Sequence, residues 1–350
     1  MTLNEPSWWY GNSAAWQAKV LAPLGWLYGR ASARRMRGGT PYRAQCPVIC
    51  IGNFTAGGTG KTPMSLAVAA IVRDLGRTPI FLSRGYGGTI SGPVFVDTSR
   101  HAAADVGDEP LLLAQAAPAV IARDRAAGAR LIERDANPGT VIIMDDGLQN
   151  PSLVKDLVIA VVDGQRGLGN QAVIPAGPLR APLAFQAALA DAIVVNSGSQ
   201  KPDFPGLDKL QQCFSGPLLI ARTEVTADAR ALRGVKVVAY AGIANPTRFF
   251  RALDERGATV CDRVAFADHH AFTAADCERL LALAAAHGAR LITTEKDFVR
   301  LNGNSEPASQ RLKSATQTLA IKLVLADGDA SVLRELIAKA VAPTARHKGF

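Results

Sequence analysis

A short run of small, basic and hydroxyl residues has the composition of a phosphate-binding loop. It consists of Thr55, Ala56, Gly57, Gly58, Thr59, Gly60, Lys61 and Thr62. Glycines let several backbone N–H groups point at phosphate oxygens, and the helix that follows adds the positive end of its dipole. We expect this P-loop to bind ATP, with Lys61 at the β- and γ-phosphates and the Thr62 hydroxyl on Mg²⁺. Thr55 replaces the first consensus glycine, while the core from Gly57 onward is complete.

Two adjacent carboxylates follow an apolar stretch farther along the chain. Residues 141–144 are all apolar, and Asp145 and Asp146 come directly after them. A buried strand that ends in acid places a carboxylate at the carboxyl edge of a parallel sheet, where a P-loop also lies. Carboxylate oxygens there can hold Mg²⁺ directly or through water. Either carboxylate of the pair could contact the metal.

Two further patterns indicate chemistry less strongly. Residues 85–88 are Gly-Tyr-Gly-Gly after an apolar stretch, but the third glycine and the helix of a dinucleotide turn are missing. His269 and His270 follow Asp268 and could bind a metal, yet no helical His-Glu-x-x-His pattern is present. Their spacing alone favours a structural role.

Apolar strands alternate with helical patterns from residue 47 onward. We expect strands at residues 47–52, 79–83, 141–144, 157–162, 192–196, 235–241 and 290–294, and helices at 62–75, 111–119, 247–256 and 274–287. This alternation predicts an α/β protein with a parallel sheet covered on both faces. The Pro/Gly-rich stretch at 164–182 suggests a boundary. We therefore expect a P-loop core domain at 46–160 and a second, smaller α/β domain at 161–325 that contributes to the substrate cleft.

The first 45 residues differ in composition from the rest. The net charge is +9, no acidic residue lies between Glu5 and Asp74, and all four tryptophans fall within the first 26 residues. Aromatic and basic side chains together are typical of a membrane interface, although a helix packed on the core would explain the apolar positions equally well. The basic run at 30–37 favours the membrane-interacting segment. Pro23 and Gly25 should bend or break its helix, and no apolar stretch is long enough to span a bilayer.

Missing signatures narrow the class of P-loop protein. The guanine-recognition motif of GTPases, Asn/Thr-Lys-x-Asp, is absent. Residues 294–297 (TEKD) come close to it but place Lys and Asp side by side. Ala56 stands where partition ATPases carry an extra lysine, and the protein-kinase motifs are missing. A small-molecule or lipid kinase remains. A P-loop nucleotide switch and an ATP-dependent ligase are the alternatives, and no motif supports a nucleic-acid partner.

Eight short motifs together resemble one enzyme family, the tetraacyldisaccharide 4′-kinases (lipid A 4′-kinases). They are LAPLGWLY (21–28), GNFTAGGTGKTP (52–63), LSRGY (82–86), GDEP (107–110), DDGLQ (145–149), PAGPLR (175–180), DH (268–269) and TEKD (294–297). Thr55 fits the P-loop of this family. Leu148 departs from the aromatic residue expected there, which should alter packing rather than chemistry.

The resemblance implies an ATP- and Mg²⁺-dependent kinase of lipid A biosynthesis. Its acceptor would be the 4′-hydroxyl of an acylated glucosamine disaccharide 1-phosphate. This substrate lies in the cytosolic leaflet, so the enzyme would be a peripheral protein on the cytoplasmic face of the inner membrane. No obligate protein partner is expected. The resemblance also implies a strand pair that links the two domains and a C-terminal helix near 330–345 that completes the core domain.

Roles for individual residues follow as hypotheses. A sugar hydroxyl needs a base to accept its proton, and Asp108, oriented or tuned by His269, is the candidate. Without the resemblance, Asp108 would be a carboxylate that caps the helix at Pro110. Lys61 would act on the transferred phosphate, and Thr62, Glu109 and Asp145 or Asp146 would hold the metal. Two arginines, Arg125 and Arg180, would bind phosphate groups, and Tyr86 would contact the sugar.

Overall fold

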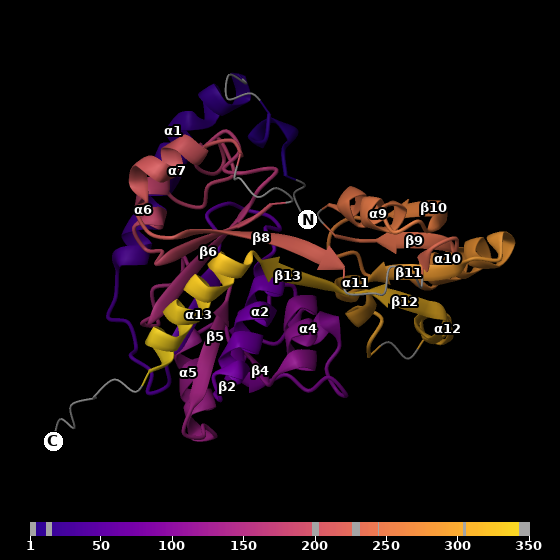
Figure 1. Ribbon diagram of the computed structural model, residues 1–350, viewed down its shortest axis with the longest axis horizontal. Helices are drawn as coiled ribbons and strands as arrows, with labels where there is room; N and C mark the ends of the chain where they lie inside the picture. Colours follow the sequence, from indigo (N-terminus) through magenta and orange to yellow (C-terminus); the bar gives the residue numbers. More distant parts are fainter. Residues whose placement is uncertain are drawn as a thin grey trace.

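The computed structural model describes residues 5–11, 16–197, 203–225, 232–243, 245–303 and 306–342. Two α/β units lie side by side, one around a nine-stranded sheet and one around a four-stranded sheet (Figure 1). The predicted fold class is therefore confirmed. Both units have apolar strands that are buried on both faces, as expected of parallel sheets covered by helices.

The larger sheet places the P-loop strand at its centre. Its order is β13-β8-β7-β6-β1-β5-β2-β4-β3, and all neighbours are parallel except the outer pairs β13–β8 and β3–β4. The strands are β1 (Val48–Gly52), β2 (Thr78–Ser83), β3 (Val94–Phe95), β4 (Ala119–Ile121), β5 (Thr140–Asp145), β6 (Leu157–Asp163), β7 (Ala192–Asn196), β8 (Leu218–Val225) and β13 (Ile321–Leu325). The carboxyl ends of β5, β1, β6 and β7 therefore lie next to one another at one edge.

Helices cover both faces of this sheet. On one face lie α2 (Lys61–Asp74), α4 (Asp108–Ala116) and α13 (Asp327–Val341), and on the other α5 (Arg125–Arg134), α6 (Leu183–Ala187) and α7 (Leu207–Cys213). The short helix α3 (Ala103–Val106) leads into α4. The C-terminal helix packs Leu333 and Ile337 into the same apolar cluster as α2. It thus completes the core domain up to Val341; residues 343–345 of the expected helix lie outside the described residues.

The predicted domain boundary after residue 160 is wrong. β6 pairs with β1 and β7 pairs with β6, so the segment that continues to β8 belongs to the core sheet. The Pro/Gly-rich stretch at 164–182 returns to the P-loop instead, where Ala56 N donates to Pro178 O and Arg180 N to Phe54 O. Proline and glycine mark a loop, but they do not indicate whether the next strand joins the same sheet.

The second domain follows β8. Its parallel sheet has the order β10-β9-β11-β12, with strands β9 (Lys236–Ala241), β10 (Thr259–Ala265), β11 (Arg290–Thr294) and β12 (Thr316–Leu319). The helices α9 (Pro246–Asp254), α10 (Ala274–His287), α11 (Glu295–Val299) and α12 (Pro307–Ala315) surround it. The antiparallel pair β8 and β13 connects the two domains (Figure 1), as the family resemblance implies.

The N-terminal helix α1 (Trp16–Arg37) continues through Pro23, so of the predicted bend or break the break does not occur. Gly25 and Gly29 permit close packing on the loop at 173–182, since a Cβ at Gly25 would lie 2.7 Å from Val173 O. The opposite side of α1 is apolar and exposed: Trp16, Val20, Leu24, Trp26, Leu27 and Tyr28 are each at least 44% exposed. These apolar side chains therefore belong to a helix, as both interpretations of the sequence require, but they point to solvent instead of packing on the core.

The other two tryptophans behave differently. They belong to the 3₁₀ turn η1 (Ser7–Trp9), are partly buried, and pack edge-on against each other. The Trp9 indole donates to Pro175 O at 3.2 Å, which ties η1 to the loop beside the P-loop. None of the helices in the described part of the chain has the length and apolar character that a membrane span needs.

Candidate active site

The P-loop lies between β1 and the first turn of α2, as the sequence predicts. Gly57 and Gly60 have φ values of 93° and 96°, which glycine adopts readily and other residues rarely do. Gly60 is the N-cap residue of α2, so Lys61 and Thr62 are the first two helical residues. The first N–H groups of a helix have no partner within it, so this helix start can bind a phosphate.

Two buried polar atoms at the P-loop lack a protein partner. Within the described residues, neither Asn53 Oδ1 nor the Thr59 hydroxyl makes a hydrogen bond, although both side chains are buried. A buried polar group without a partner costs about 1–3 kcal/mol. The Thr59 hydroxyl can donate to a phosphate oxygen, so its lack of a partner fits a loop that is completed by nucleotide.

Asp145 and Asp146 end β5 beside the P-loop, and their surroundings differ. Asp145 is buried and accepts a hydrogen bond from Ser65 Oγ at 2.8 Å. Asp146 has φ 49° and lies 3.7 Å from Lys61 Nζ and 3.0 Å from Arg180 Nη1. Positive φ in a non-glycine residue is uncommon and often marks a functional site.

Charge explains how the two carboxyl groups differ. Burial and the neighbouring Asp146 raise the pKa of Asp145. Burial also acts to raise the pKa of Asp146, but Lys61 and Arg180 outweigh it and lower the pKa to about 2. A divalent cation would relieve the burial of Asp145, since oxygen ligands of this kind suit Mg²⁺. The donor set therefore fits the predicted metal.

A second cluster of charged groups forms at the N-terminus of α4. Gly107, with φ 90°, is the N-cap residue, and Asp108 and Glu109 form the first turn, where the helix dipole favours negative charge. Asp108 is only 4% exposed. The alternative role for Asp108, a cap before a helix that starts at Pro110, does not apply, because α4 already starts at Asp108; its Oδ1 accepts the neighbouring Glu109 N–H at 3.1 Å.

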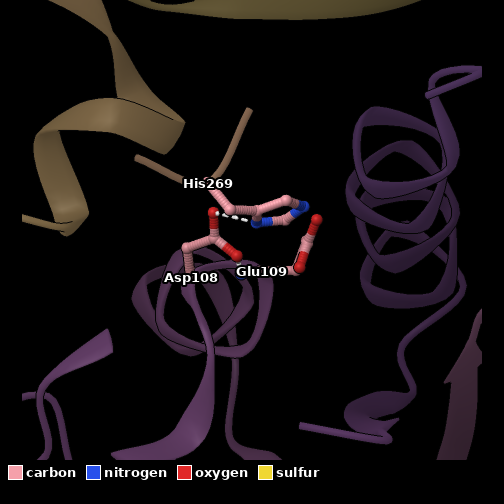
Figure 2. Close-up of side chains that lie close together, drawn as sticks. All are labelled: Asp108, Glu109 and His269. Atoms are coloured by element: carbon pink, nitrogen blue, oxygen red, sulfur yellow. Dashed lines mark hydrogen bonds and ion pairs between the residues drawn. The ribbon is translucent and has the colours of Figure 1, made fainter. Parts of the chain in front are cut away.

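His269 comes from the loop after β10 in the second domain and meets these carboxylates (Figure 2). Its Nδ1 lies 3.0 Å from Asp108 Oδ2, and this hydrogen bond raises the pKa of His269. Asp108, Glu109 and His269 each offer an atom within 4.8 Å of the others, which would suffice for a cation. The φ of 59° at His269 adds a second uncommon backbone conformation among the predicted site residues.

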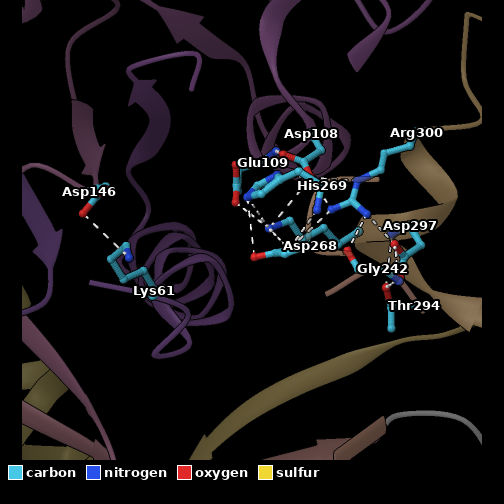
Figure 3. Close-up of polar contacts among 12 residues, drawn as sticks. Lys61, Asp108, Glu109, Asp146, Gly242, Asp268, His269, Thr294, Asp297 and Arg300 are labelled. Atoms are coloured by element: carbon cyan, nitrogen blue, oxygen red, sulfur yellow. Dashed lines mark hydrogen bonds and ion pairs between the residues drawn. The ribbon is translucent and has the colours of Figure 1, made fainter. Parts of the chain in front are cut away.

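Sequence reasoning missed two cations of this cluster, Lys296 and Arg300. Lys296 Nζ lies 2.8 Å from Glu109, and Arg300 Nη2 lies 2.6 Å from Asp108 Oδ2 (Figure 3). Burial would raise the pKa of Asp108, but His269, Lys296 and Arg300 together hold it well below its usual range. Lys296 belongs to the TEKD motif, to which the sequence alone assigns no role, whereas no sequence pattern points to Arg300.

The predicted phosphate and sugar contacts occupy different surroundings. Arg180 donates to both oxygens of Asp146 and to Thr55 O. Arg125 is the first residue of α5 and is 2% exposed; burial lowers its pKa to about 10. Tyr86 is 62% exposed, and its ring centroid lies 5.9 Å from that of His269.

The two groups of residues face each other across the edge of the sheet (Figure 3). On one side are Lys61 and Asp146, and on the other Asp108 and Glu109 with their partners from the second domain. Burial lowers the pKa of Lys61, while the charges of Asp146 and, more weakly, Glu109 oppose this shift. Among the described residues Glu109 forms an ion pair with Lys296 and none with the P-loop.

An N-terminal segment also contacts the P-loop. The Tyr10 hydroxyl donates to Ala56 O at 3.4 Å, and Glu5 forms an ion pair with Arg166 at 2.8 Å. A Cβ at Gly57 would collide with the Glu5 carboxylate, which shows how closely this segment approaches the loop.

Comparison with known proteins identifies the family of this chain. Residues 17–342 match the profile of the family described as Tetraacyldisaccharide-1-P 4′-kinase. The chain is 48% identical over 343 residues to a Tetraacyldisaccharide 4′-kinase of Methylorubrum extorquens, covering 97% of this chain and 99% of the relative. It is 45% identical over 346 residues to that of Nitrobacter winogradskyi, covering 98% and 99%.

A solved structure is similar in fold as well. The "apo" form of LpxK from Aquifex aeolicus in complex with ATP matches with a TM-score of 0.70 and 25% identity, covering 93% of this chain and 99% of that chain. The sequence motifs, the fold and the comparisons agree. The chain belongs to the tetraacyldisaccharide-1-P 4′-kinase family.

Proposed function

We propose that this chain transfers the γ-phosphate of ATP to the 4′-hydroxyl of a tetraacyldisaccharide 1-phosphate, a step of lipid A biosynthesis. Family membership supports the substrate. The observation in the structure that supports phosphoryl transfer is the P-loop facing a buried Asp108 that is paired with the half-buried His269 (Figure 3). One group binds the phosphate donor, and the other can accept the proton of a hydroxyl acceptor.

The P-loop side would bind and polarise ATP. Backbone N–H groups at the start of α2 and the Thr59 hydroxyl would bind phosphate oxygens, and Lys61 would pair with the β- and γ-phosphates. Thr62 and Asp145 would hold Mg²⁺, because Asp146 is already paired with Lys61 and Arg180. When bound, Mg²⁺ would neutralise charge that develops on the phosphates.

The Asp108–His269 pair would act as the proton acceptor. Asp108 Oδ2 contacts His269 and Arg300, whereas Oδ1 accepts only the Glu109 N–H among the described contacts. Oδ1 therefore keeps lone-pair capacity for the proton of the 4′-hydroxyl. His269 would hold Asp108 in place. Glu109 would complete the metal shell after releasing Lys296.

Three further residues would contact the substrates. Arg180 lies beside both Asp146 and the P-loop carbonyl of Thr55, so its guanidinium can reach a phosphate of ATP or of the lipid. Arg125 would support the same region through its charge. Tyr86, exposed next to His269, would pack on the sugar ring.

The exposed side of α1 would bind the cytosolic leaflet of the inner membrane. Six of its apolar side chains are exposed, and Arg30 lies over the Trp26 ring at 4.8 Å. The last turn carries Arg34, Arg35 and Arg37, which can meet lipid phosphates. A lipid substrate would thus reach the enzyme from the membrane, and the enzyme would be peripheral.

The central test uses labelled ATP, Mg²⁺ and detergent-solubilised tetraacyldisaccharide 1-phosphate, with Lys61→Ala as the control. We expect a labelled lipid that disappears in the control. ATP hydrolysis without labelled lipid would instead support a nucleotide switch, and hydrolysis stimulated by a soluble carboxylic acid would support a ligase.

Membrane binding needs a separate test. The double variant Leu24→Ser/Leu27→Ser should cosediment less with vesicles of phosphatidylethanolamine and phosphatidylglycerol, because it removes exposed apolar area. Val332→Ser, an exposed apolar position on α13, is the matched control. Equal sedimentation of the double variant and the control would argue against the α1 surface as the anchor.

A further inference from the structure

The helix α11 lies at the interface between the two domains, and the proposed chemistry gives it no role. It packs on α4, and its Val299 is buried in a cluster with Val106, Leu111 and Ile121 of the core domain. This apolar contact fixes where α11 sits relative to the first turn of α4. Packing of Val299 therefore helps to place the polar residues on either side of it.

Arg300 directly follows α11, and all three nitrogens of its guanidinium donate hydrogen bonds. Its Nε and Nη2 donate to Asp108 Oδ2 at 2.9 and 2.6 Å, and Nη1 donates to Gly242 O at 2.7 Å and to Asp297 Oδ1 at 2.5 Å. The Arg300 side chain is only 5% exposed. A planar group held at three nitrogens has little freedom to rotate.

Asp297, which accepts a hydrogen bond from Arg300, is itself held by several hydrogen bonds. Asp297 is fully buried and also accepts hydrogen bonds from Gly242 N–H at 3.0 Å and from the Thr294 hydroxyl at 2.7 Å. Thr294 is the N-cap residue of α11, and its hydroxyl accepts the Asp297 N–H. Thr294 and Asp297 of the TEKD motif thus form a hydrogen-bond network in the second domain that holds Arg300 in place.

Lys296, also of the TEKD motif, contacts the second carboxylate on α4, that of Glu109. Its Nζ lies 2.8 Å from Glu109, 3.7 Å from Asp268 and 3.5 Å from His269 Nε2. The two carboxylates on α4 are therefore held by three side chains of the second domain. Burying such charges is costly and contributes little net stability, so docking of the domains alone is a poor explanation for placing them on these carboxylates.

We propose that Arg300 is a positioning residue of the phosphoryl transfer: it fixes the carboxylate of Asp108 through Oδ2 and leaves Oδ1 for the acceptor hydroxyl. Lys296 pairs with the neighbouring Glu109 until Glu109 turns to the metal. The inference rests on the proposed kinase function. It also means that the proton acceptor is complete only when the second domain is docked on α4, since Arg300 and His269 both come from that domain.

The test compares Arg300→Gln, Arg300→Lys and the control Arg311→Gln. Arg311 is exposed and pairs with Glu278 within the second domain. For Arg300→Gln we expect kcat for the formation of labelled lipid to fall about 100-fold, which is the scale of a lost positioning contact. The KM for ATP should change less than about twofold. Arg300→Lys should recover about tenfold of this loss, because lysine keeps the positive charge but lacks the planar guanidinium that donates several hydrogen bonds at once. Arg311→Gln should match the wild type.

A double-mutant cycle separates positioning from a purely structural role. In an Asp108→Asn background, adding Arg300→Gln should cause no further loss of kcat, because the residue acts through Asp108. Additive losses, or a rise in both KM values without a change in kcat, would overturn the inference. If thermal melting shows that the Arg300→Gln protein is not folded, Arg300→Lys replaces it in the same double-mutant cycle.

The outcome also distinguishes the two proposals. Full kcat in Arg300→Gln beside an active wild type overturns the positioning role and leaves the kinase intact. A wild type that forms no labelled lipid overturns the proposed function and this inference with it.

Discussion

The two halves of the site are built in different ways. The P-loop half comes from neighbouring elements of one sheet: β1, the loop, α2 and the end of β5. The Asp108 half is assembled from two domains, with partners 161 and 192 residues away in the sequence. The first half depends on local backbone geometry, and the second depends on how one domain packs on the other.

This difference predicts which functions fail separately. A change in the P-loop half should impair both nucleotide binding and turnover, because the same groups bind the phosphates and stabilise the transition state. A change in the Asp108 half should impair turnover alone, since the proposed contacts to ATP all come from the P-loop half. Four substitutions test that separation, from the largest expected effect to the smallest.

Lys61→Ala should cause the largest loss. Lys61 is the first residue of α2 and is the P-loop cation that would pair with the β- and γ-phosphates. Cations that act on the transferred phosphoryl group contribute on the order of 10³–10⁵-fold to turnover. We expect kcat to fall by about 10⁴-fold and ATP affinity to weaken at least about tenfold. Titration calorimetry with a non-hydrolysable ATP analogue checks the second effect, and unchanged affinity would contradict the assignment.

Asp108→Asn should come next and should leave nucleotide binding intact. Asparagine keeps the shape of the side chain but cannot accept a proton as a base, and general-base catalysis contributes about 10²–10⁴-fold. We therefore expect kcat to fall by about 10³-fold with the dissociation constant of the ATP analogue within about twofold of the wild type. An equal loss of ATP affinity in this variant would break the separation between the halves.

Asp145→Asn tests the metal assignment within the P-loop half. Asp145 contacts Ser65, whereas Asp146 is neutralised by Lys61 and Arg180, so removing the Asp145 charge should weaken Mg²⁺ most. We expect the Mg²⁺ concentration at half-maximal rate to rise about tenfold and excess Mg²⁺ to restore part of the activity. Asp146→Asn is the matched variant. If it raises the Mg²⁺ requirement more than Asp145→Asn does, the two roles are reversed.

The same difference explains what the sequence could and could not reveal. The P-loop was predictable because eight consecutive residues carry it, and the end of β5 was predictable because an apolar strand leads directly into Asp145. The prediction that Asp108 and His269 meet came from the family resemblance alone, since spacing cannot test it. Arg300 has no local signature, because its role depends on the packing of Val299 across the interface.

Errors in the predicted fold have local causes. The helix predicted at 111–119 ends at Ala116, since Pro118 forces Ala117 into an extended conformation with φ −156° and ψ 164°. The strand β4 then starts at Ala119. In α1, by contrast, Pro23 is tolerated inside a continuous helix that packs its glycines on the loop at 173–182. Tertiary contacts decide between these outcomes, and local propensity alone does not.

Val299→Ala should have the smallest effect and tests whether packing assembles the Asp108 half. Val299 is 1% exposed in the interdomain cluster. Removing two methyl groups from a buried site costs about 2 kcal/mol, most of it in the docking of α11 on α4. We expect kcat to fall about three- to tenfold, because His269 and Arg300 meet Asp108 less often, while ATP affinity stays within about twofold.

Val237→Ala is the control for that variant, since Val237 is equally buried but belongs to the sheet of the second domain. It should lower the melting temperature by a similar amount and leave kcat unchanged below the transition. If both variants reduce kcat equally, general loss of stability explains the effect and α11 does not position the base. If only Val299→Ala does so, the packing of one domain on the other sets the geometry of the proton acceptor, while the nucleotide site remains a property of the core domain alone.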